Sequence, residues 1–455
     1  MMSLQEAALA THGKLLGVDA QFLAVSTDSR EDLHGKLFVA LCGERFDAHD
    51  YLDQAAAQGA VAALVDERAD LQAPAGLSLV KVADTRLALG ALAAHWRDKF
   101  SIPLIGVTGS NGKTTVKEMC AAILRAWLGE EAVLATLGNL NNDIGLPQML
   151  LRLRATHCAA VIEMGMNHPG EIAYLAALAK PSVAIVTNAQ RAHLAGMGGL
   201  KAVAEEKGEI YRALGPQGVA VINVDVEHAT YWYAQHGEAE AVGFGLDHAA
   251  DVSATCVAQG LGSLVRLRTP QGDAEFVLPV PGVHNVRNAL GAVAATLAAG
   301  APFDAVVRGL SGFVGAKGRL QRKHGLRGAM LLDDTYNANP DSVRAGIDVL
   351  AEAPGCKILV IGDMGEIGEM SAQYHDEIGG YAKSAGVDRL FALGEQSALT
   401  ARNFGSGGEH FESIEALIEA VQAALAPEVL VLIKGSRFMR MERVAEALTL
   451  LKNKD

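Results

Sequence analysis

The chain has 455 residues, half of them hydrophobic, and a formal net charge of −13 at pH 7. This length predicts a globular protein of several domains, and an acidic balance without a basic stripe argues against nucleic acid as the main partner. The five cysteines are scattered and form no C-x-x-C pair, which indicates free thiols in a reducing cytoplasm rather than disulfides or zinc. No apolar run approaches the roughly 18 residues of a membrane span, so we expect a cytoplasmic protein without membrane insertion.

Residues 1–98 have the pattern of a small α/β domain. Short apolar runs at 36–41 and 61–65 predict strands, and the alanine-rich segment 51–59 predicts a helix between them.

Residues 99–312 have the pattern of a larger domain with a mainly parallel sheet. Its predicted strands, which alternate with helical segments, are 102–105, 159–162, 183–186 and 219–222. Within 251–280, alternating runs at 264–267 and 275–278 lie on either side of a Pro-Gln-Gly-Asp turn and predict an antiparallel insertion.

Residues 313–455 predict a third, Rossmann-like α/β domain. Its expected strands are 330–332, 358–361, 390–393 and 429–433. Ligands of such a sheet lie at the carboxyl ends of the strands. The chain is therefore expected to be a three-domain α/β protein.

The segment 106–115, Gly-Val-Thr-Gly-Ser-Asn-Gly-Lys-Thr-Thr, is typical of a phosphate-binding loop because it lies between an apolar strand and a helical pattern over 116–128. Backbone N–H groups of such a loop converge on an anion, a lysine reaches the β and γ phosphates, and a threonine binds Mg²⁺. The first glycine lies one residue further away than in the usual motif, and a glycine-rich turn with a surface lysine is the alternative. The candidate ATP-binding residues are Gly109, Ser110, Asn111, Gly112, Lys113, Thr114 and Thr115.

Two further polar residues follow predicted strands of the middle domain. Glu163 ends the strand 159–162, where a second Mg²⁺ ligand is needed beside a phosphate loop. A carboxylate that caps the next helix is the alternative interpretation. His193 follows the strand 183–186 in a polar turn, so it is a candidate for metal or phosphate binding, with a structural role as the alternative.

Lys207 lies within the apolar stripe of a predicted helix and therefore faces the protein interior. A lone buried ammonium is unfavourable by several kcal/mol, so the group must be paired, adjacent to a metal or chemically altered. The alternative is a lysine that extends to the rim or pairs with Glu205, Glu206 or Glu209.

Polar clusters near the third domain complete the candidate site. Asn285 and Asn288 lie on one face of the first turn of a helix that continues over 289–299, where they cap the helix or bind the edge of a ring. Arg319 follows a glycine-rich hinge and is placed to swing onto a phosphate. One of the adjacent acids Asp333 and Asp334 is a candidate for holding a ribose, and the asparagines that follow them are candidates for binding a small polar substrate.

These motifs together resemble the Mur ligase family of ATP-dependent amino-acid and peptide ligases over essentially the whole chain. The family's T-G-x-N-G-K-T-T loop corresponds to 108–115, its E-x-G acid to Glu163, its histidine to His193 and its H-N-x-x-N amides to Asn285 and Asn288. Arg319 and Asp334 complete its invariant set, and its carbamylated lysine corresponds to Lys207.

The resemblance implies ATP, two Mg²⁺ ions and a CO₂-derived carbamate on Lys207 as cofactors. It makes Lys113, Glu163, His193 and Lys207 the catalytic residues, and Thr114, Glu163, His193 and the carbamate of Lys207 the metal ligands.

Within the family, segments 28–30, 43–49, 138–145, 336–340 and 362–366 resemble the members that join D-alanyl-D-alanine to UDP-N-acetylmuramoyl-tripeptide. The resemblance assigns UDP-substrate binding to Asp28, Ser29, Arg30, Asn139, Asn141 and Asn142, and dipeptide binding to Asn337 and Asn339. A D-N-P-R motif, with which the diaminopimelate-adding members bind their amino acid, is absent.

We expect a monomer. The rival hypotheses are another amide ligase, either diaminopimelate-adding or folylpolyglutamate synthase, and, from a different class, a phosphate-loop ATPase switch.

Overall fold

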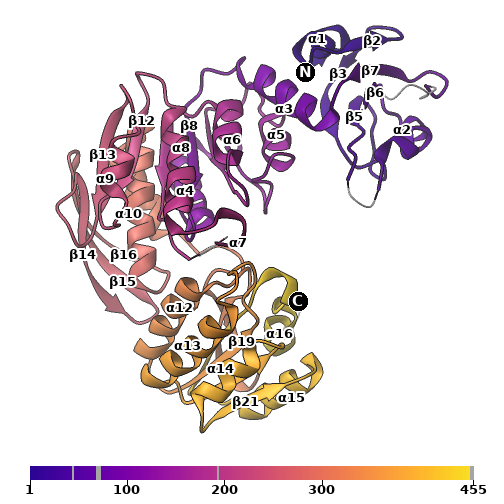
Figure 1. Ribbon diagram of the computed structural model, residues 1–455. Helices are drawn as coiled ribbons and strands as arrows, with labels where there is room; N and C mark the ends of the chain where they lie inside the picture. Colours follow the sequence, from indigo (N-terminus) through magenta and orange to yellow (C-terminus); the bar gives the residue numbers. More distant parts are fainter. Residues whose placement is uncertain (44–45, 68–72, 192–193, 451–455) are drawn as a thin grey trace, which may run out of the picture.

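The computed structural model describes residues 1–43, 46–67, 73–191 and 194–450, which form three α/β units in chain order (Figure 1). The sheets of these units lie within 1–98, 99–312 and 313–455. The predicted three-domain α/β fold is confirmed, and the positions of the boundaries stay predictions.

The N-terminal unit is built on a five-stranded sheet of order β2-β7-β6-β5-β4, in which β2 is antiparallel to β7 and the other neighbours are parallel. Its strands are β2 (Lys14–Leu16), β4 (Ala24–Ser26), β5 (Lys36–Val39), β6 (Ala62–Asp66) and β7 (Ser78–Val82). A two-stranded ribbon is formed by β1 (Met2–Ser3) and β3 (Gln21–Phe22). The helices are α1 (Leu4–Ala10), η1 (Ala48–Tyr51), α2 (Leu52–Ala57) and α3 (Thr85–Arg97).

Helix α3 joins this unit to the middle one. The Trp96 indole donates to the Leu153 carbonyl at 3.1 Å, and the Arg97 guanidinium donates to the Ala179 carbonyl at 3.0 Å. One apolar cluster runs from Leu4 through Leu92 to Ile162 and so spans both units. Because that cluster is continuous, the first two units share one hydrophobic core.

The middle unit has a nine-stranded sheet of order β16-β15-β14-β13-β12-β11-β8-β10-β9. The pairs from β9 to β14 are parallel, and β14, β15 and β16 form an antiparallel extension. Its strands are β8 (Leu104–Thr108), β9 (Val133–Ala135), β10 (Ala159–Glu163), β11 (Val183–Val186), β12 (Val219–Asn223), β13 (Glu240–Gly245), β14 (Val252–Gln259), β15 (Gly262–Thr269) and β16 (Gly272–Leu278).

Helices cover both faces of this sheet, as expected for buried parallel strands. One face packs against α4 (Lys113–Leu128), α10 (Val283–Ala298) and α11 (Phe303–Ser311). The other face packs against α6 (Glu171–Ala179) and α8 (Leu200–Arg212). Shorter helices are η2 (Glu130–Ala132), α5 (Gly145–Leu150), α7 (Leu194–Met197) and α9 (Ala229–Tyr233).

The C-terminal unit has a six-stranded sheet of order β17-β18-β22-β19-β20-β21, parallel except that β17 is antiparallel to β18. Its strands are β17 (Gln321–His324), β18 (Met330–Asp334), β19 (Cys356–Gly362), β20 (Arg389–Leu393), β21 (Gly408–Phe411) and β22 (Val429–Lys434). Its helices are η3 (Leu326–Gly328), α12 (Pro340–Glu352), α13 (Ser371–Ser384), α14 (Ser397–Phe404), α15 (Ile414–Ala424), η4 (Arg437–Met439) and α16 (Glu442–Leu448).

The predicted strands and the antiparallel insertion are confirmed. Leu264 pairs with Val277 and Arg266 with Glu275, which is the register expected from the two alternating runs. Short strands such as β9, β17 and β21 were not predicted, because three or four residues, polar in β17 and β21, carry too little periodicity. The five-residue β7 and the six-residue β13 were also missed.

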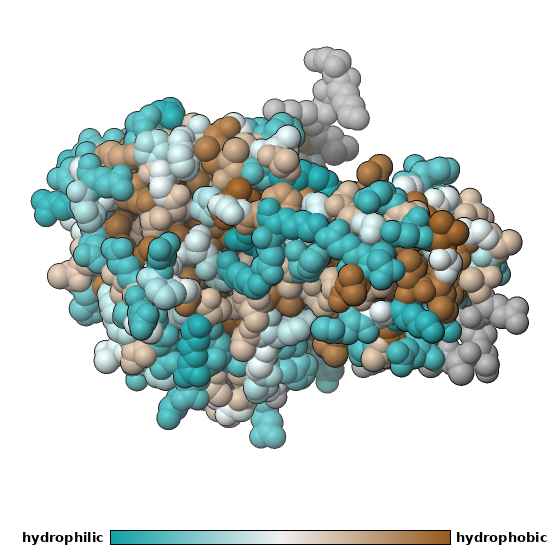
Figure 2. All heavy atoms as spheres, turned by 90° about the horizontal axis from the view of Figure 1, so that it is seen from above, coloured by the Kyte–Doolittle hydropathy of each residue, from teal (hydrophilic) through white to brown (hydrophobic). Residues whose placement is uncertain are grey.

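The described residues contain no helix that is both long and apolar enough to cross a membrane. On the face shown in Figure 2, hydrophilic and hydrophobic residues are interspersed. Exposed apolar side chains such as Val18 and Val314 are ordinary when they are scattered in this way.

Candidate active site

The phosphate loop connects β8 to α4, as the motif predicts. Gly112, the residue before the helix, has φ 83°, in the left-handed region that favours glycine. A Cβ atom at this position would lie 2.4 Å from Oδ1 of Asn288, so glycine is also required for space. The loop therefore fits tightly against the first turns of α10.

Neighbouring strand ends hold the loop in place. The amide of Ser110 donates to the Asn188 carbonyl at 3.0 Å, and that of Asn111 donates to Oδ1 of Asn188 at 2.9 Å. The Thr187 hydroxyl donates to the Asn111 carbonyl at 2.6 Å. The backbone of the loop is thus fixed by the residues that follow β11.

Two cavities meet at this loop. The larger, of about 300 Å³, lies between the N-termini of α4 and α10 and the carboxyl ends of β18 and β22. The smaller, of about 260 Å³, lies between the loop, the end of β10 and the segment after β18. Asn111, Arg319 and Ser342 line both. A ligand in one cavity is therefore adjacent to a ligand in the other across the loop.

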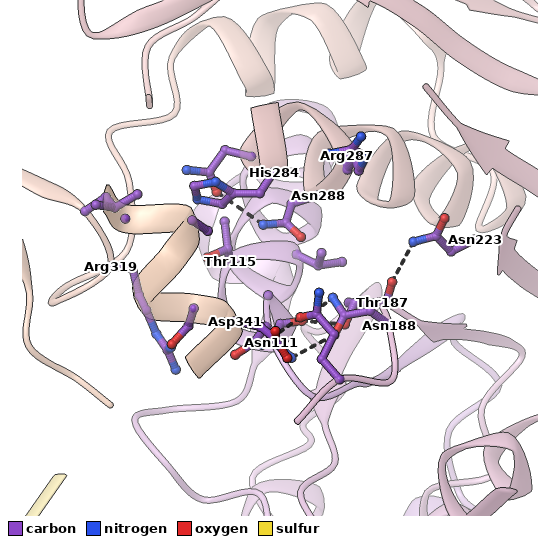
Figure 3. Close-up of a pocket in the computed structure, with 18 of the residues that line it drawn as sticks. Asn111, Thr115, Thr187, Asn188, Asn223, His284, Arg287, Asn288, Arg319 and Asp341 are labelled. Atoms are coloured by element: carbon purple, nitrogen blue, oxygen red, sulfur yellow. Dashed lines mark hydrogen bonds between the residues drawn. The ribbon is translucent and has the colours of Figure 1, made fainter. Parts of the chain in front are cut away.

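Amides and an imidazole from α10 form one wall of the larger cavity (Figure 3). Asn288 donates to Oδ1 of Asn285 at 3.2 Å, and Asn285 donates to the Pro281 carbonyl at 2.7 Å. Burial lowers the pKa of His284 to about 4, so its ring is neutral at pH 7. These neutral polar groups suit the hydrogen-bonding edge of an uncharged heterocycle.

A buried ion pair lies at the carboxyl ends of the C-terminal strands. Lys434 donates to Oδ2 of Asp334 at 2.6 Å and to the Asn337 carbonyl at 3.0 Å. The other oxygen of Asp334 accepts from the Leu320 amide at 3.2 Å. Both side chains line or adjoin the larger cavity, so this pair fixes the acid that was predicted to hold a ribose.

Three buried polar atoms of residues lining the smaller cavity have no hydrogen-bond partner among the described residues: Oε2 of Glu163, Nε of Arg319 and Oδ2 of Asp143, the last of which forms an ion pair with Arg86. Arg319 lies over the Tyr336 ring at 4.1 Å and donates to the Thr114 hydroxyl at 3.4 Å. Lys113 donates to the Gly109 carbonyl at 2.8 Å. Burial lowers the pKa of Lys113, and Glu163 opposes that shift. The cavity therefore presents cationic groups and one free carboxylate oxygen.

Lys207 is 1% exposed and lies on α8, as predicted. Its ammonium has neither a hydrogen bond nor an ion pair with another described residue, so the alternative interpretation, a pair with a neighbouring glutamate, is not observed. Burial lowers the pKa of Lys207 well below its usual value, the nearby positive charge of Lys113 adds to the shift, and Glu206 opposes it. The amine is therefore far easier to deprotonate than an exposed lysine.

The residue types present fit a magnesium ion bound together with phosphate better than a metal ion held by protein side chains alone. Within the described ranges, no group of three or more histidine, cysteine, aspartate or glutamate residues could hold a metal ion. Mg²⁺ in nucleotide sites typically takes one or two carboxylates and completes its shell with phosphate oxygens and water. The unpartnered oxygen of Glu163 matches that requirement.

Polar contacts, here called the interdomain clasp, join the middle and C-terminal units beside the loop. Asn339 donates to Oδ1 of Asn111 at 2.8 Å. Arg191 donates to Asp341 from its backbone at 2.9 Å and from Nη2 at 2.6 Å, and it lies 3.5 Å from Glu377. Hydrogen bonding to Asp341 raises the pKa of Arg191. The clasp holds the first turn of α12 against the phosphate loop.

An Arg191→Gln variant is expected to loosen this arrangement. Charge-assisted hydrogen bonds contribute about 1.5–3 kcal/mol each, and the pair is only about a quarter exposed, so screening is incomplete. We expect a larger radius of gyration by small-angle scattering. Arg344→Gln is the matched control, because Arg344 binds the same Glu377 at 2.9 Å but lies entirely within the C-terminal unit. Equal scattering from both variants would contradict a role for Arg191 in docking.

The remaining predicted residues have mixed placements. Asn141, Asn142, Asn337 and Asn339 line the smaller cavity, whereas Asp28, Ser29, Arg30 and Asn139 line neither cavity. His193 lies outside the described residues. In the N-terminal unit, Arg30 binds Asp28 at 2.7 Å and holds the pKa of that acid at about 2.

Sequence reasoning missed several residues of the site. Arg191 has its partner Asp341 150 residues away, so no local pattern connects them. Lys434 offered a usable signal, because it is a charged residue at the end of a wholly apolar strand, β22.

Three Mur ligase domain models match the chain in order. Residues 22–97 match the Mur ligase family catalytic domain, 107–296 the Mur ligase middle domain and 318–437 the Mur ligase glutamate ligase domain. The chain is 44% identical over 441 residues to UDP-N-acetylmuramoyl-tripeptide–D-alanyl-D-alanine ligase of Escherichia coli strain K12, with 96% of each chain covered.

Two solved structures are similar over nearly the whole chain. One is MurF from Acinetobacter baumannii, with 38% identity, a TM-score of 0.89 and 97% of each chain covered. The other is MurF ligase from Thermotoga maritima in complex with ADP, with 27% identity, a TM-score of 0.82, and 93% of this chain and 96% of that chain covered.

Proposed function

The chain belongs to the Mur ligase family, and we propose that it joins D-alanyl-D-alanine to UDP-N-acetylmuramoyl-tripeptide at the expense of ATP, in peptidoglycan precursor synthesis. The observation that carries this proposal is the pair of cavities that meet at Asn111 and Arg319. The larger takes the nucleotide and the smaller takes the reacting carboxylate. The full-length similarity to ligases of that name selects these substrates within the family.

The reaction has two steps. An oxygen of the tripeptide's terminal carboxylate forms a bond to the γ phosphorus while the bond to the β–γ bridging oxygen breaks, which releases ADP and leaves an acyl phosphate. The amine of D-alanyl-D-alanine then forms the amide bond at the acyl carbon, inorganic phosphate departs, and the amine loses a proton.

The chain's own residues supply alignment and charge compensation, which are the main requirements of phosphoryl transfer. Lys113 and Arg319 lie where negative charge develops, and the neutral wall of His284, Asn285 and Asn288 orients the base. An acyl phosphate hydrolyses in water, so the site must close before reaction. The interdomain clasp performs that closure by holding α12 against the loop.

Two Mg²⁺ ions, bound through Glu163, the Thr114 hydroxyl, His193 and the modified Lys207, would neutralise phosphate charge in this site. The free oxygen of Glu163 supports its place in that set. Thr114 follows Lys113 in the first turn of α4, beside the phosphate loop.

Lys207 carries a carbamate in this proposal. A neutral amine attacks the carbon of CO₂, one C–O π bond becomes an oxyanion, and the nitrogen releases a proton to solvent. The lowered pKa of Lys207 favours the neutral amine that this reaction needs. Its burial without a partner among the described residues is also explained, since the modification replaces an ammonium with a metal-binding anion.

The reaction belongs in the cytoplasm, where ATP is available. All five cysteines of the chain are free, which suits a reducing compartment.

Phosphate release with each substrate omitted in turn tests the function. We expect release only when ATP, the UDP-tripeptide and D-alanyl-D-alanine are all present. Release without the dipeptide would favour a phosphate-loop ATPase switch. Release with diaminopimelate or glutamate as acceptor would favour one of the other amide ligases.

A further inference from the structure

The two carboxylate oxygens of Glu163 have different surroundings. Oε1 accepts a hydrogen bond from Nδ2 of Asn141 at 2.8 Å, whereas Oε2 is buried without a partner among the described residues. The backbone amide of Glu163 donates to the hydroxyl of the buried Thr136 at 2.9 Å. The carboxylate is therefore held on one side and free on the other.

Asn141 is itself fixed by its backbone. Its amide donates to the Asn139 carbonyl at 2.7 Å, and its carbonyl accepts from the Gly165 amide at 2.8 Å. The loop after β9 is thereby tied to the segment that follows β10. The amide side chain consequently reaches Glu163 from a backbone that is anchored at two points.

Gly165 leaves the space that the Asn141 side chain occupies. A Cβ atom at Gly165 would lie 3.1 Å from both Cγ and Oδ1 of Asn141, closer than ordinary van der Waals contact. The glycine of the Glu-Met-Gly segment thus has a physical role, because a larger residue would push the amide away from the acid. The amide, the acid and the glycine form one packed unit.

We propose that Asn141 is a positioning residue that orients Glu163 toward its cation, in place of the UDP-substrate contact expected for it. The inference rests on the proposed function of Glu163 as a metal ligand. Hydrogen bonds from neighbouring residues to ligating carboxylates restrict their orientation, and loss of such a partner typically weakens metal binding 10–100-fold. Asn141 meets this description because it binds one carboxylate oxygen and leaves the other free.

Metal binding can be measured without turnover. Mn²⁺ binding to the enzyme–ADP complex, followed by electron paramagnetic resonance, is expected to be about tenfold weaker in Asn141→Ala. In steady-state assays, the variant should require more Mg²⁺ while its KM for the UDP-tripeptide is unchanged. A residue that only contacts the UDP-substrate would give the reverse, a raised KM with unaltered Mn²⁺ affinity, and that result would overturn the proposal.

Gly165 supplies an internal control through a double-mutant cycle. Gly165→Ala alone is expected to weaken Mn²⁺ binding, because its methyl group displaces the Asn141 amide. In the Asn141→Ala background the same change should have no further effect, because the space is then empty. Additive losses would show that Gly165 acts independently of Asn141. Melting temperatures equal to that of the unaltered chain would exclude general destabilisation of the variants. If all variants instead melt at a lower temperature and this instability accounts for the weaker Mn²⁺ binding, the positioning role is contradicted.

Glu163→Gln separates this inference from the proposed function. If Glu163→Gln loses Mn²⁺ and Asn141→Ala does not, the acid is a metal ligand and the positioning role is wrong. If Glu163→Gln binds Mn²⁺ normally, the assignment of the metal site itself fails.

Discussion

Replacing Lys207 by alanine is expected to lower ligase activity by about 10²–10³-fold, the size of effect found when an active site loses one group that stabilises developing negative charge. The buried side chain has no hydrogen bond or ion pair with another residue that the structure describes, so under the proposed function its loss should affect the ligands more than the fold. Added acetate should restore part of the activity, because a short carboxylate can occupy the space of the carbamate. Activity assays with and without acetate measure both effects.

Lys201→Ala provides the matched control for this prediction. Lys201 lies on the same helix, but its side chain is 87% exposed and its pair with Glu205 at 3.7 Å is of the weak surface kind. Its activity should be unchanged. Incubation with ¹³C-labelled CO₂ should give a carbamate resonance in the unaltered chain that is missing from Lys207→Ala. Full activity of Lys207→Ala without acetate would contradict the carbamate assignment.

The second large effect is expected at Lys113. A Lys113→Ala variant should lose about 10²–10³-fold in the rate of ATP-dependent phosphate release, because the ammonium is the loop's own countercharge for the γ phosphate. Lys113→Arg should be nearly as inactive, since the planar guanidinium has a different shape and donor geometry from the compact ammonium.

Thermal unfolding distinguishes this loss from misfolding. Burial disfavours the charged form of Lys113, as its lowered pKa records, so removing the charge should not destabilise the unliganded chain. We expect an unchanged or slightly higher Tm together with the fall in activity. A variant that releases phosphate at the normal rate would contradict the assignment of this loop as the phosphate site.

Much of the candidate site was predictable because its chemistry is concentrated in short segments. The phosphate loop, Glu163 at the end of β10 and the amide pair on α10 each combine an unusual local composition with the end of an element. Parallel strands bring such ends to one edge of a sheet, so their convergence follows from the fold class. The inward orientation of Lys207 followed from helical periodicity in the same way.

Contacts between distant segments were not predictable from these patterns. Asn339 illustrates the difficulty. As the residue before α12 it has a local capping role, in which its Oδ1 accepts a hydrogen bond from the Ser342 backbone amide at 2.9 Å. The same side chain also binds Asn111, which is 228 residues away, and no periodicity encodes that pairing. Asn141 likewise resembled a substrate ligand in sequence, and only the structure placed its amide on Glu163.

The two junctions between units differ in chemistry, and this difference has a mechanical consequence. The N-terminal and middle units are joined through a continuous apolar core around α3, whereas the clasp that meets the C-terminal unit is made of amides and ions, with Leu261 as an apolar contact to the C-terminal core. Polar junctions separate readily in water, while apolar ones resist separation. Calorimetry should therefore show the first two units unfolding in one cooperative transition and the third in a separate one. Mechanically, the first two units form one rigid body, and the C-terminal unit can move relative to it.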